Sequence, residues 1–164
     1  MTTHIWLLVY VIGSRLAELI IARRNTRRLL AQGGHEVGRR HYPLIVILHV
    51  SWILALALLV PTDTPAQLIF LIPFLLLQIV RYWVLHSLDR RWTTRIIILP
   101  EAPLVKQGPY RWLRHPNYLV VVAEIALLPL VFGAWEMAIG FSLANAVLLG
   151  VRIHAEDRAL HTHK

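Results

Sequence analysis

Cysteine is absent from the 164 residues of this chain. Its absence excludes disulfides, thiolate metal sites and a cysteine nucleophile. Charged residues are also scarce, at 16% of the chain, whereas apolar residues make up 57% and the mean hydropathy is +0.56. A soluble domain carries about 25% charged residues. The composition therefore places the chain among membrane proteins.

The apolar residues form segments long enough to cross a bilayer, whose ~30 Å hydrocarbon core needs roughly 20 residues of helix. Three such segments are Ile5–Ala22, Leu44–Val60 and Gln67–His86. A fourth, Tyr118–Val151, is too long for one span and is interrupted at residues 133–136. We interpret it as a helical hairpin. The sequence thus predicts one all-α integral membrane domain over residues 1–164, with about five transmembrane helices, the last two forming the hairpin.

Acidic residues are few, with nine Asp and Glu against seventeen Lys and Arg. Sixteen of the seventeen basic residues fall on one side of the five-span arrangement, in residues 23–43, 81–117 and 152–164. The positive-inside rule then places the N-terminus outside and the C-terminus in the cytoplasm. Because the charge lies between apolar spans and no nucleic-acid-binding motif is present, we interpret the net charge of +8 as a topology signal. We expect membrane lipids, and no nucleic acid, as partners.

Several common catalytic signatures are also missing. The sequence has no dinucleotide-binding glycine motif, no P-loop and no nucleophile elbow. Nine histidines are present, but no two lie three or four residues apart on one span, the spacing of a helical metal site. We predict no metal site.

Polar residues gather instead in two patches predicted to lie at the same face of the bilayer. The first runs from Lys106 to Tyr118 and mixes basic residues, aromatic rings and prolines. The second runs from Arg152 to Arg158, and in a helix Arg152 and Glu156 share one face because they are four residues apart. The first patch fits an anionic, ring-containing ligand. Its composition alone fits an ordinary basic interfacial loop equally well.

Ionisable residues also occur inside the predicted spans, where such residues usually have a partner or a function. Arg15 and Glu18 are spaced to form a local ion pair. Arg81 lies near the inner end of its span, and its long side chain is expected to reach the membrane surface. Glu124 lies roughly 9 Å into the bilayer, without a partner in its own span. We expect Glu124 to meet a ligand or a cation from another helix, and we take Arg81 and Glu124 as candidate substrate-binding residues.

At these positions the sequence resembles the isoprenylcysteine carboxyl methyltransferase family of integral membrane enzymes. The resemblance covers residues 81–160. It is carried by Gly108-Pro109-Tyr110-Arg111, by Arg114-His115-Pro116-Asn117-Tyr118, and by Arg152 with Glu156 after an apolar hairpin. The short length and Trp92-Thr93-Thr94 look closer to the small bacterial branch, some of whose members are similar to alkylpyrone O-methyltransferases. This likeness implies a bacterial inner-membrane location.

The resemblance implies that residues 81–160 form the cofactor-binding and catalytic region, with S-adenosylmethionine as cofactor and a cytoplasmic cofactor-binding loop. By position it assigns catalysis to Arg152 and Glu156. It assigns cofactor binding to Val105, Gly108, Tyr110, Arg114, His115, Pro116 and Tyr118. Two positions depart from the family pattern, since Asp157 stands where the family has a second Glu and Asp89 follows Leu88 where the family has Gly.

The predicted function is S-adenosylmethionine-dependent methyl transfer to an oxygen of a lipophilic acceptor at the cytoplasmic membrane face. The acceptor oxygen belongs to a carboxylate or to an enol or phenol, and the acceptor is a lipophilic small molecule or a prenylated molecule. Two alternatives stay open: an NADPH-dependent membrane reductase of the steroid and sterol type, and a non-catalytic membrane subunit. The oligomeric state also stays open.

Overall fold

The computed structural model describes residues 2–100, 102–103 and 105–162, without the side chains of residue 157 and residues 159–162. Five long helices and four short elements make up the described part. The helices are α1 (Thr3–Ala31), α2 (Tyr42–Leu59), α3 (Leu68–Leu88), α4 (Pro116–Val131) and α5 (Trp135–Thr162). The short elements are the strands β1 (His35–Val37) and β2 (Ile96–Ile98) and the 3₁₀ turns η1 (Asp89–Arg91) and η2 (Gly108–Arg111).

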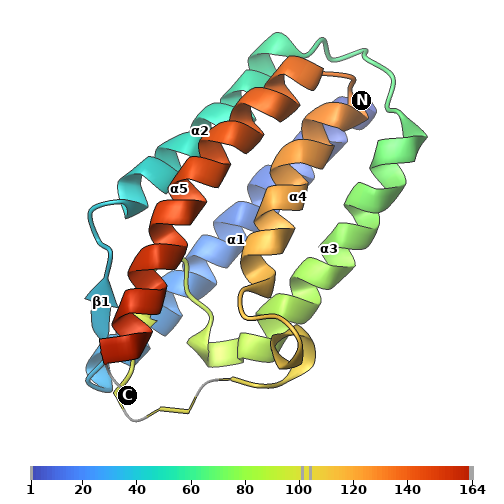
Figure 1. Cartoon of the computed structure of the whole chain (residues 1–164). Helices are drawn as coiled ribbons and strands as arrows, with labels where there is room; N and C mark the ends of the chain where they lie inside the picture. The colour runs from blue at the N-terminus through green and yellow to red at the C-terminus, as the bar shows by residue number, and fades with distance from the viewer. Residues whose placement is uncertain (1, 101, 104, 163–164) are drawn as a thin grey trace.

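The five helices run alternately up and down in one bundle (Figure 1). The N-terminus, the α2–α3 turn and the α4–α5 turn lie at one end. The short strands, the 3₁₀ turns and the C-terminal end of α5 lie at the other. Helices α1, α2, α3 and α5 are long and apolar enough to cross a membrane, and α4 is a shorter apolar helix of 16 residues. The prediction of an all-α integral membrane protein with a C-terminal hairpin is confirmed.

Apolar residues occupy both the inside and the outside of the bundle. Inside, Leu56, Phe74 and Leu128 each expose at most 1% of their surface. Outside, Leu58 and Ile69 keep more than 70% of their surface exposed. Outward apolar surface on this scale suits a lipid environment, where the backbone polar groups are satisfied within the helices. The core therefore forms between the helices, and the outward apolar surface is suited to contact with lipid.

Two features at the strand-bearing end extend beyond the predicted spans. Helix α1 continues nine residues past Ala22, because its Arg, Leu and Ala residues favour helix even outside the apolar stretch. Strands β1 and β2 pair antiparallel in a two-stranded ribbon, with Glu36 opposite Ile97. The sequence analysis did not predict this ribbon, which joins the α1–α2 connection to the segment after η1.

The ionisable residues inside the spans meet in one buried network. Arg81 of α3 donates hydrogen bonds to Glu18 of α1 at 2.5 and 2.7 Å and to Glu124 of α4 at 2.6 Å. Arg15 bridges the same two carboxylates, at 3.0 Å to Glu18 and 3.2 Å to Glu124. Gln78 of α3 donates a further bond to Glu124 at 3.1 Å.

The network corrects one prediction and confirms another. Arg81 does not extend toward the membrane surface, because its side chain is 5% exposed and is held between two carboxylates. Glu124 does meet cations from other helices, as its lack of a partner in its own span predicted. The local pair of Arg15 with Glu18 also forms. Each of the two arginines thus contacts both glutamates within the bundle interior.

Candidate active site

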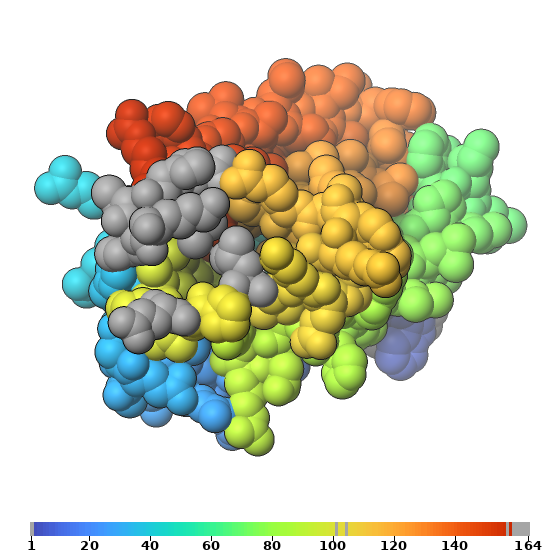
Figure 2. Space-filling view, turned by 60° about the horizontal axis from the view of Figure 1, so that its bottom comes forward, coloured from blue at the N-terminus to red at the C-terminus, as the bar shows by residue number. Residues whose placement is uncertain are grey.

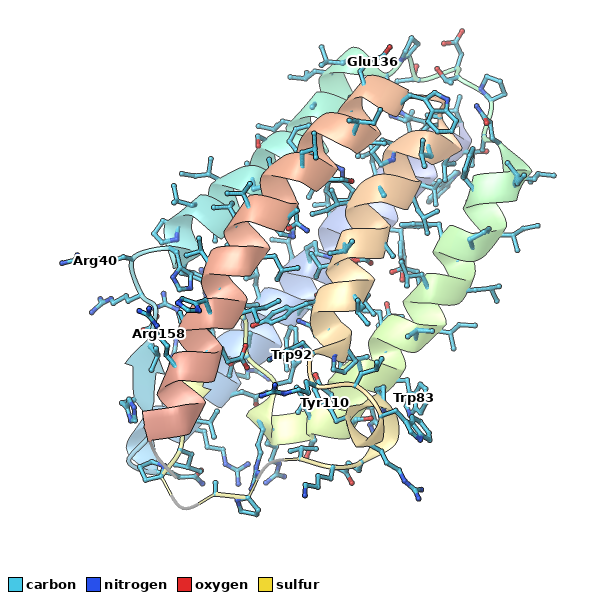
Figure 3. All side chains as sticks on the ribbon, in the orientation of Figure 1. Arg40, Trp83, Trp92, Tyr110, Glu136 and Arg158 are labelled. Atoms are coloured by element: carbon cyan, nitrogen blue, oxygen red, sulfur yellow. The ribbon has the colours of Figure 1, made fainter. Side chains whose placement is uncertain are left out.

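A cavity of about 410 Å³ lies at the strand-bearing end of the bundle. Its walls come from the ends of α1 and α3, the segment 91–95, β2, described residues of the segment 99–115, α4 and α5. In Figure 2 this end faces the viewer, with blue residues of the N-terminal half below the yellow residues and red residues of α5 at the upper left. Figure 3 places Trp92 and Tyr110 here and Glu136 at the opposite end. The volume falls within the roughly 300–1,000 Å³ of small-molecule pockets.

Three side chains form a hydrogen-bonded cluster in the cavity wall. The Tyr118 hydroxyl donates to Glu156 Oε2 at 2.5 Å, and Arg152 Nε donates to the Tyr118 oxygen at 2.9 Å. The guanidinium carbon of Arg152 also lies 5.5 Å from the centre of the Tyr118 ring. The phenol therefore links the cation to the carboxylate, a role that the sequence analysis did not foresee for Tyr118.

The helical hairpin explains why these residues meet. Tyr118 is the third residue of α4, whereas Arg152 and Glu156 lie near the end of α5, which runs back antiparallel to α4. The two ends of the hairpin thus lie at the same level. Within α5 the four-residue spacing keeps Arg152 and Glu156 on one face, as the sequence predicts.

His115 completes the cluster at the start of α4. Its ring stacks on Tyr118 with centres 5.2 Å apart and planes 20° apart. Its Nδ1 lies 3.7 Å from Glu156 Oε2. Pro116 occupies the first turn of α4, where the missing amide proton costs nothing and the fixed φ suits the helix. Pro116 therefore sets where the helix begins and where His115 lies.

The guanidinium of Arg152 is fixed on two sides. Nε is bound to Tyr118, and Nη2 donates to the backbone oxygen of Thr94 at 2.9 Å. Within the described part of the chain, Nη1 has no recorded hydrogen-bond partner, although Arg152 as a whole is only 9% exposed. This third nitrogen is a donor that a ligand in the cavity could use.

Tyr110 of η2 lines the same cavity. Burial, and to a smaller extent the charge of Glu156, raise the pKa of Tyr110 well above its usual value. The phenol stays protonated at physiological pH and can act as a hydrogen-bond donor to a ligand.

Most predicted site residues line the cavity, and four do not. The lining residues from that set are Val105, Tyr110, Arg114, His115, Tyr118, Arg152 and Glu156. Pro116 is buried at the start of α4 and does not line the cavity. Arg81 and Glu124 belong to the separate network in the bundle interior. The side chain of Asp157 lies outside the described part.

Gly108, the fourth, has a packing role. It adopts φ +55°, and a β-carbon there would collide with Ser87 Oγ of α3. The neighbouring Gln107 amide donates to the Ser87 backbone oxygen at 2.9 Å. Only glycine lets the loop lie this close to α3. The glycine therefore holds the loop in place over the cavity.

Other wall residues escaped the sequence analysis. Ile96 and Ile98 of β2 and Leu88 of α3 add apolar surface to the cavity wall. Thr94, whose backbone oxygen binds Arg152, was noted only as part of a sequence motif. No spacing rule could have found the contacts of β2 and of Thr94, because they depend on how the ribbon packs. Among the described residues, no group of three or more His, Asp or Glu side chains is placed to share a metal ion.

Comparison with known proteins identifies the family. Residues 68–162, more than half of the chain, match the isoprenylcysteine carboxyl methyltransferase (ICMT) family. The chain belongs to the ICMT family. It is therefore a member of a family of membrane methyltransferases, as the Arg-His-Pro-Asn-Tyr segment and the later Arg152 and Glu156 indicated.

Two relatives resemble the chain over nearly its whole length. The Bacillus subtilis protein named Uncharacterized protein YpbQ is 44% identical over 163 residues, which cover 96% of this chain and 97% of that protein. A Haemophilus influenzae protein, named only Uncharacterized protein, is 29% identical over 161 residues, which cover 92% of this chain and 90% of that protein. No solved structure matches the chain. The ICMT match includes the whole Arg152 cluster but not β1 or Tyr42.

Proposed function

We propose that this ICMT-family protein transfers a methyl group from S-adenosylmethionine to an oxygen of a lipophilic acceptor at the cytoplasmic face of a bacterial inner membrane. The observation that carries the proposal is the Arg152–Tyr118–Glu156 cluster in the wall of a ligand-sized cavity. Family membership supplies the reaction class, and the cluster supplies groups suited to it.

The cavity fits the proposed cofactor in size and in chemistry. The lining includes apolar residues and the aromatic residues Trp92 and Tyr110, which suit an adenine ring. It also includes the Arg152 cluster and Arg114, which suit the polar amino-acid end. Val105, Tyr110, Arg114, His115 and Tyr118 would hold the cofactor. When bound, S-adenosylmethionine would supply an electrophilic sulfonium methyl group.

Arg152 is suited to hold the acceptor oxygen. With Nε and Nη2 fixed by Tyr118 and Thr94, its Nη1 is left to donate to an oxygen in the cavity. A guanidinium stabilises negative charge on that oxygen before transfer, and its fixed orientation needs little reorganisation. Since methyl transfer needs the oxygen and the methyl carbon in line, alignment supplies much of the rate.

Glu156 has a role that depends on the acceptor. A carboxylate acceptor is already ionised and needs no base. An enol or phenol acceptor must lose a proton, and Glu156 is the carboxylate nearest to Arg152 in the cavity wall. In the first case Glu156 orients Tyr118, and through it Arg152. In the second case it also takes the proton.

The position of the cavity suits a reaction between two phases. The basic segments and the cavity lie at the same end of the bundle, where a polar cofactor enters from water. The exposed apolar helix faces lie in lipid, from which a lipophilic acceptor arrives. A site at the boundary admits each partner from its own phase.

Calorimetric titration of the detergent-purified protein tests the proposal. We expect micromolar binding of S-adenosylhomocysteine and no binding of NADPH. His115→Ala should weaken S-adenosylhomocysteine binding at least tenfold, whereas Arg90→Ala, a change at an exposed position, should not. Binding of NADPH alone would move the protein to the reductases. Binding of neither ligand would favour a non-catalytic subunit.

A methyl-transfer assay then addresses the acceptor. S-farnesyl-N-acetylcysteine and a long-chain 4-hydroxy-2-pyrone represent the carboxylate and enol classes. If the pyrone is methylated, Glu156→Gln should reduce kcat strongly, because an enol needs a base. If the carboxylate is methylated, Glu156→Gln should reduce kcat far less.

A further inference from the structure

One of the two hydrogen bonds that orient Arg152 goes to a backbone atom. Its Nη2 donates to the carbonyl oxygen of Thr94, 58 residues earlier in the chain. The direction of the guanidinium therefore depends on what holds the backbone of residues 92–95, a stretch without regular secondary structure.

Tyr42 holds this stretch from α2. Its hydroxyl shares a 3.1 Å hydrogen bond with Thr94 Oγ1, on the same residue whose carbonyl oxygen receives Arg152. Tyr42 is the first residue of α2 and lies outside the cavity wall and outside the ICMT match. A chain of contacts thus runs from α2, through Thr94, to the cluster on α5.

The β1–β2 ribbon holds the next residue. Arg95 Nη1 lies 2.9 Å from both carboxylate oxygens of Glu36 in β1. The Arg95 guanidinium also lies over the Tyr42 ring, 4.7 Å from its centre. On the other side, Asn25 of α1 donates to the Trp92 backbone oxygen at 2.8 Å. Three elements of the N-terminal half therefore fix the segment on which Arg152 rests.

We propose that Tyr42 is a positioning residue, which sets the orientation of Arg152 through Thr94. Its importance for catalysis rests on the proposed methyl transfer, but its hold on Arg152 does not. Tyr42 does not line the cavity, so it acts on kcat rather than on cofactor binding. Small displacements of an aligning group can reduce a rate by orders of magnitude. For the loss of one indirect hydrogen bond we expect roughly tenfold.

The first experiment measures the hold on Arg152 without any ligand. The purified protein is treated with phenylglyoxal, and modification of Arg152 is followed by peptide mass spectrometry. We expect Tyr42→Phe and Thr94→Val each to accelerate modification of Arg152 about fivefold or more, while the exposed Arg90 reacts at an unchanged rate. The double variant should react no faster than the faster single variant, because both changes remove the same hydrogen bond between Tyr42 and Thr94. Tyr82→Phe, which removes a hydroxyl bonded to Tyr10 in the bundle, is the matched control.

An unchanged Arg152 modification rate in both single variants overturns the proposal, whether or not the protein transfers methyl groups. Additive rates in the double variant do the same, since they would show two separate effects. Thermal unfolding of each variant identifies any general loss of structure, and Thr94→Val gives a second test if Tyr42→Phe folds poorly.

The second experiment measures kinetics with the acceptor that the wild type methylates. We expect Tyr42→Phe to lower kcat roughly tenfold with the KM for S-adenosylmethionine little changed, and to have no further effect in an Arg152→Lys background. An active wild type with an equally active Tyr42→Phe overturns the catalytic role of Tyr42. A wild type that methylates neither probe counts against the proposed function, and the modification rates still decide whether Tyr42 holds Arg152.

Discussion

At the scale of single residues, Tyr118 connects three other side chains of the candidate site. Its hydroxyl accepts from Arg152 and donates to Glu156, and its ring stacks on His115. By resemblance alone this tyrosine belonged to the cofactor contacts. Its position in the structure also makes it the link between the two residues predicted to be catalytic.

Tyr118→Phe removes the link while keeping the ring. We expect kcat for methyl transfer to fall about 10- to 100-fold, because a hydrogen bond to a charged group contributes about 1.5–3 kcal/mol. S-adenosylhomocysteine affinity should change much less, since the stacking surface remains. Steady-state kinetics and calorimetry on the same preparation check this. An unchanged kcat would remove Tyr118 from the reaction, and Tyr10→Phe serves as the control for a lost phenol elsewhere.

His41, which precedes α2, gives a prediction about pH. Burial, and then the charge of Arg152, lower the pKa of His41 below its usual 6.5. As the pH falls below about 6.5, His41 binds a proton more readily in the unfolded chain than in the folded protein. The folded state therefore loses stability in that range. Melting temperatures between pH 5 and 8 should show a smaller acid loss for His41→Gln than for the wild type. Equal pH dependence would contradict this.

At the scale of elements, buried charges join helices that the apolar pattern alone does not connect. Arg81 of α3 reaches Glu18 of α1 and Glu124 of α4, and Arg15 of α1 reaches Glu124. Breaking a buried ion pair by removing one partner is costly because the other charge stays buried. The network therefore fixes the position of α1 against the α3–α4 pair.

Arg81→Met tests this role, because it leaves two buried carboxylates facing each other with only Arg15 between them. We expect the free energy of unfolding to fall by about 3 kcal/mol, toward the lower end of the range for broken buried pairs. Denaturant unfolding in detergent, followed by tryptophan fluorescence, measures it. Adding Glu18→Gln should restore part of the loss, and Arg90→Ala should have no effect. If Arg81→Met is as stable as the wild type, the network does not hold α1.

At the scale of the whole molecule, the two ends of the bundle differ in their content of basic residues. The β ribbon, the cavity and the long basic connections share one end, and the short turns at the other end hold no Lys or Arg within residues 61–66 and 133–136. Sequence and structure agree on this division. The side of the membrane to which each end belongs follows from the charge and stays a prediction.

The absence of cysteine makes the topology directly testable. Thr62→Cys lies in the α2–α3 connection, and Arg39→Cys lies in the α1–α2 connection at the opposite end. In intact cells, a membrane-impermeant maleimide should label Thr62→Cys only. Arg39→Cys should react after permeabilisation. The reverse pattern would invert the proposed orientation and place the cavity outside.

The sequence by itself determined the number of helices, the hairpin and the pairing of Arg152 with Glu156 on one face. It could do so because span length, charge placement and helical spacing are properties of neighbouring residues. The ends of α1 and α5 were less predictable, since polar residues with good helix propensity extended both helices past the apolar stretches.

Only the tertiary structure decided what lies behind the site. Tyr42 meets Thr94 across 52 residues, and Thr94 meets Arg152 across 58. Gly108 packs on Ser87, and Arg81 turns inward to two glutamates rather than outward to water. None of these contacts follows from local pattern, because each depends on how the helices and the ribbon pack. In lipid a buried charge needs a partner from another helix, and only the assembled bundle supplies it.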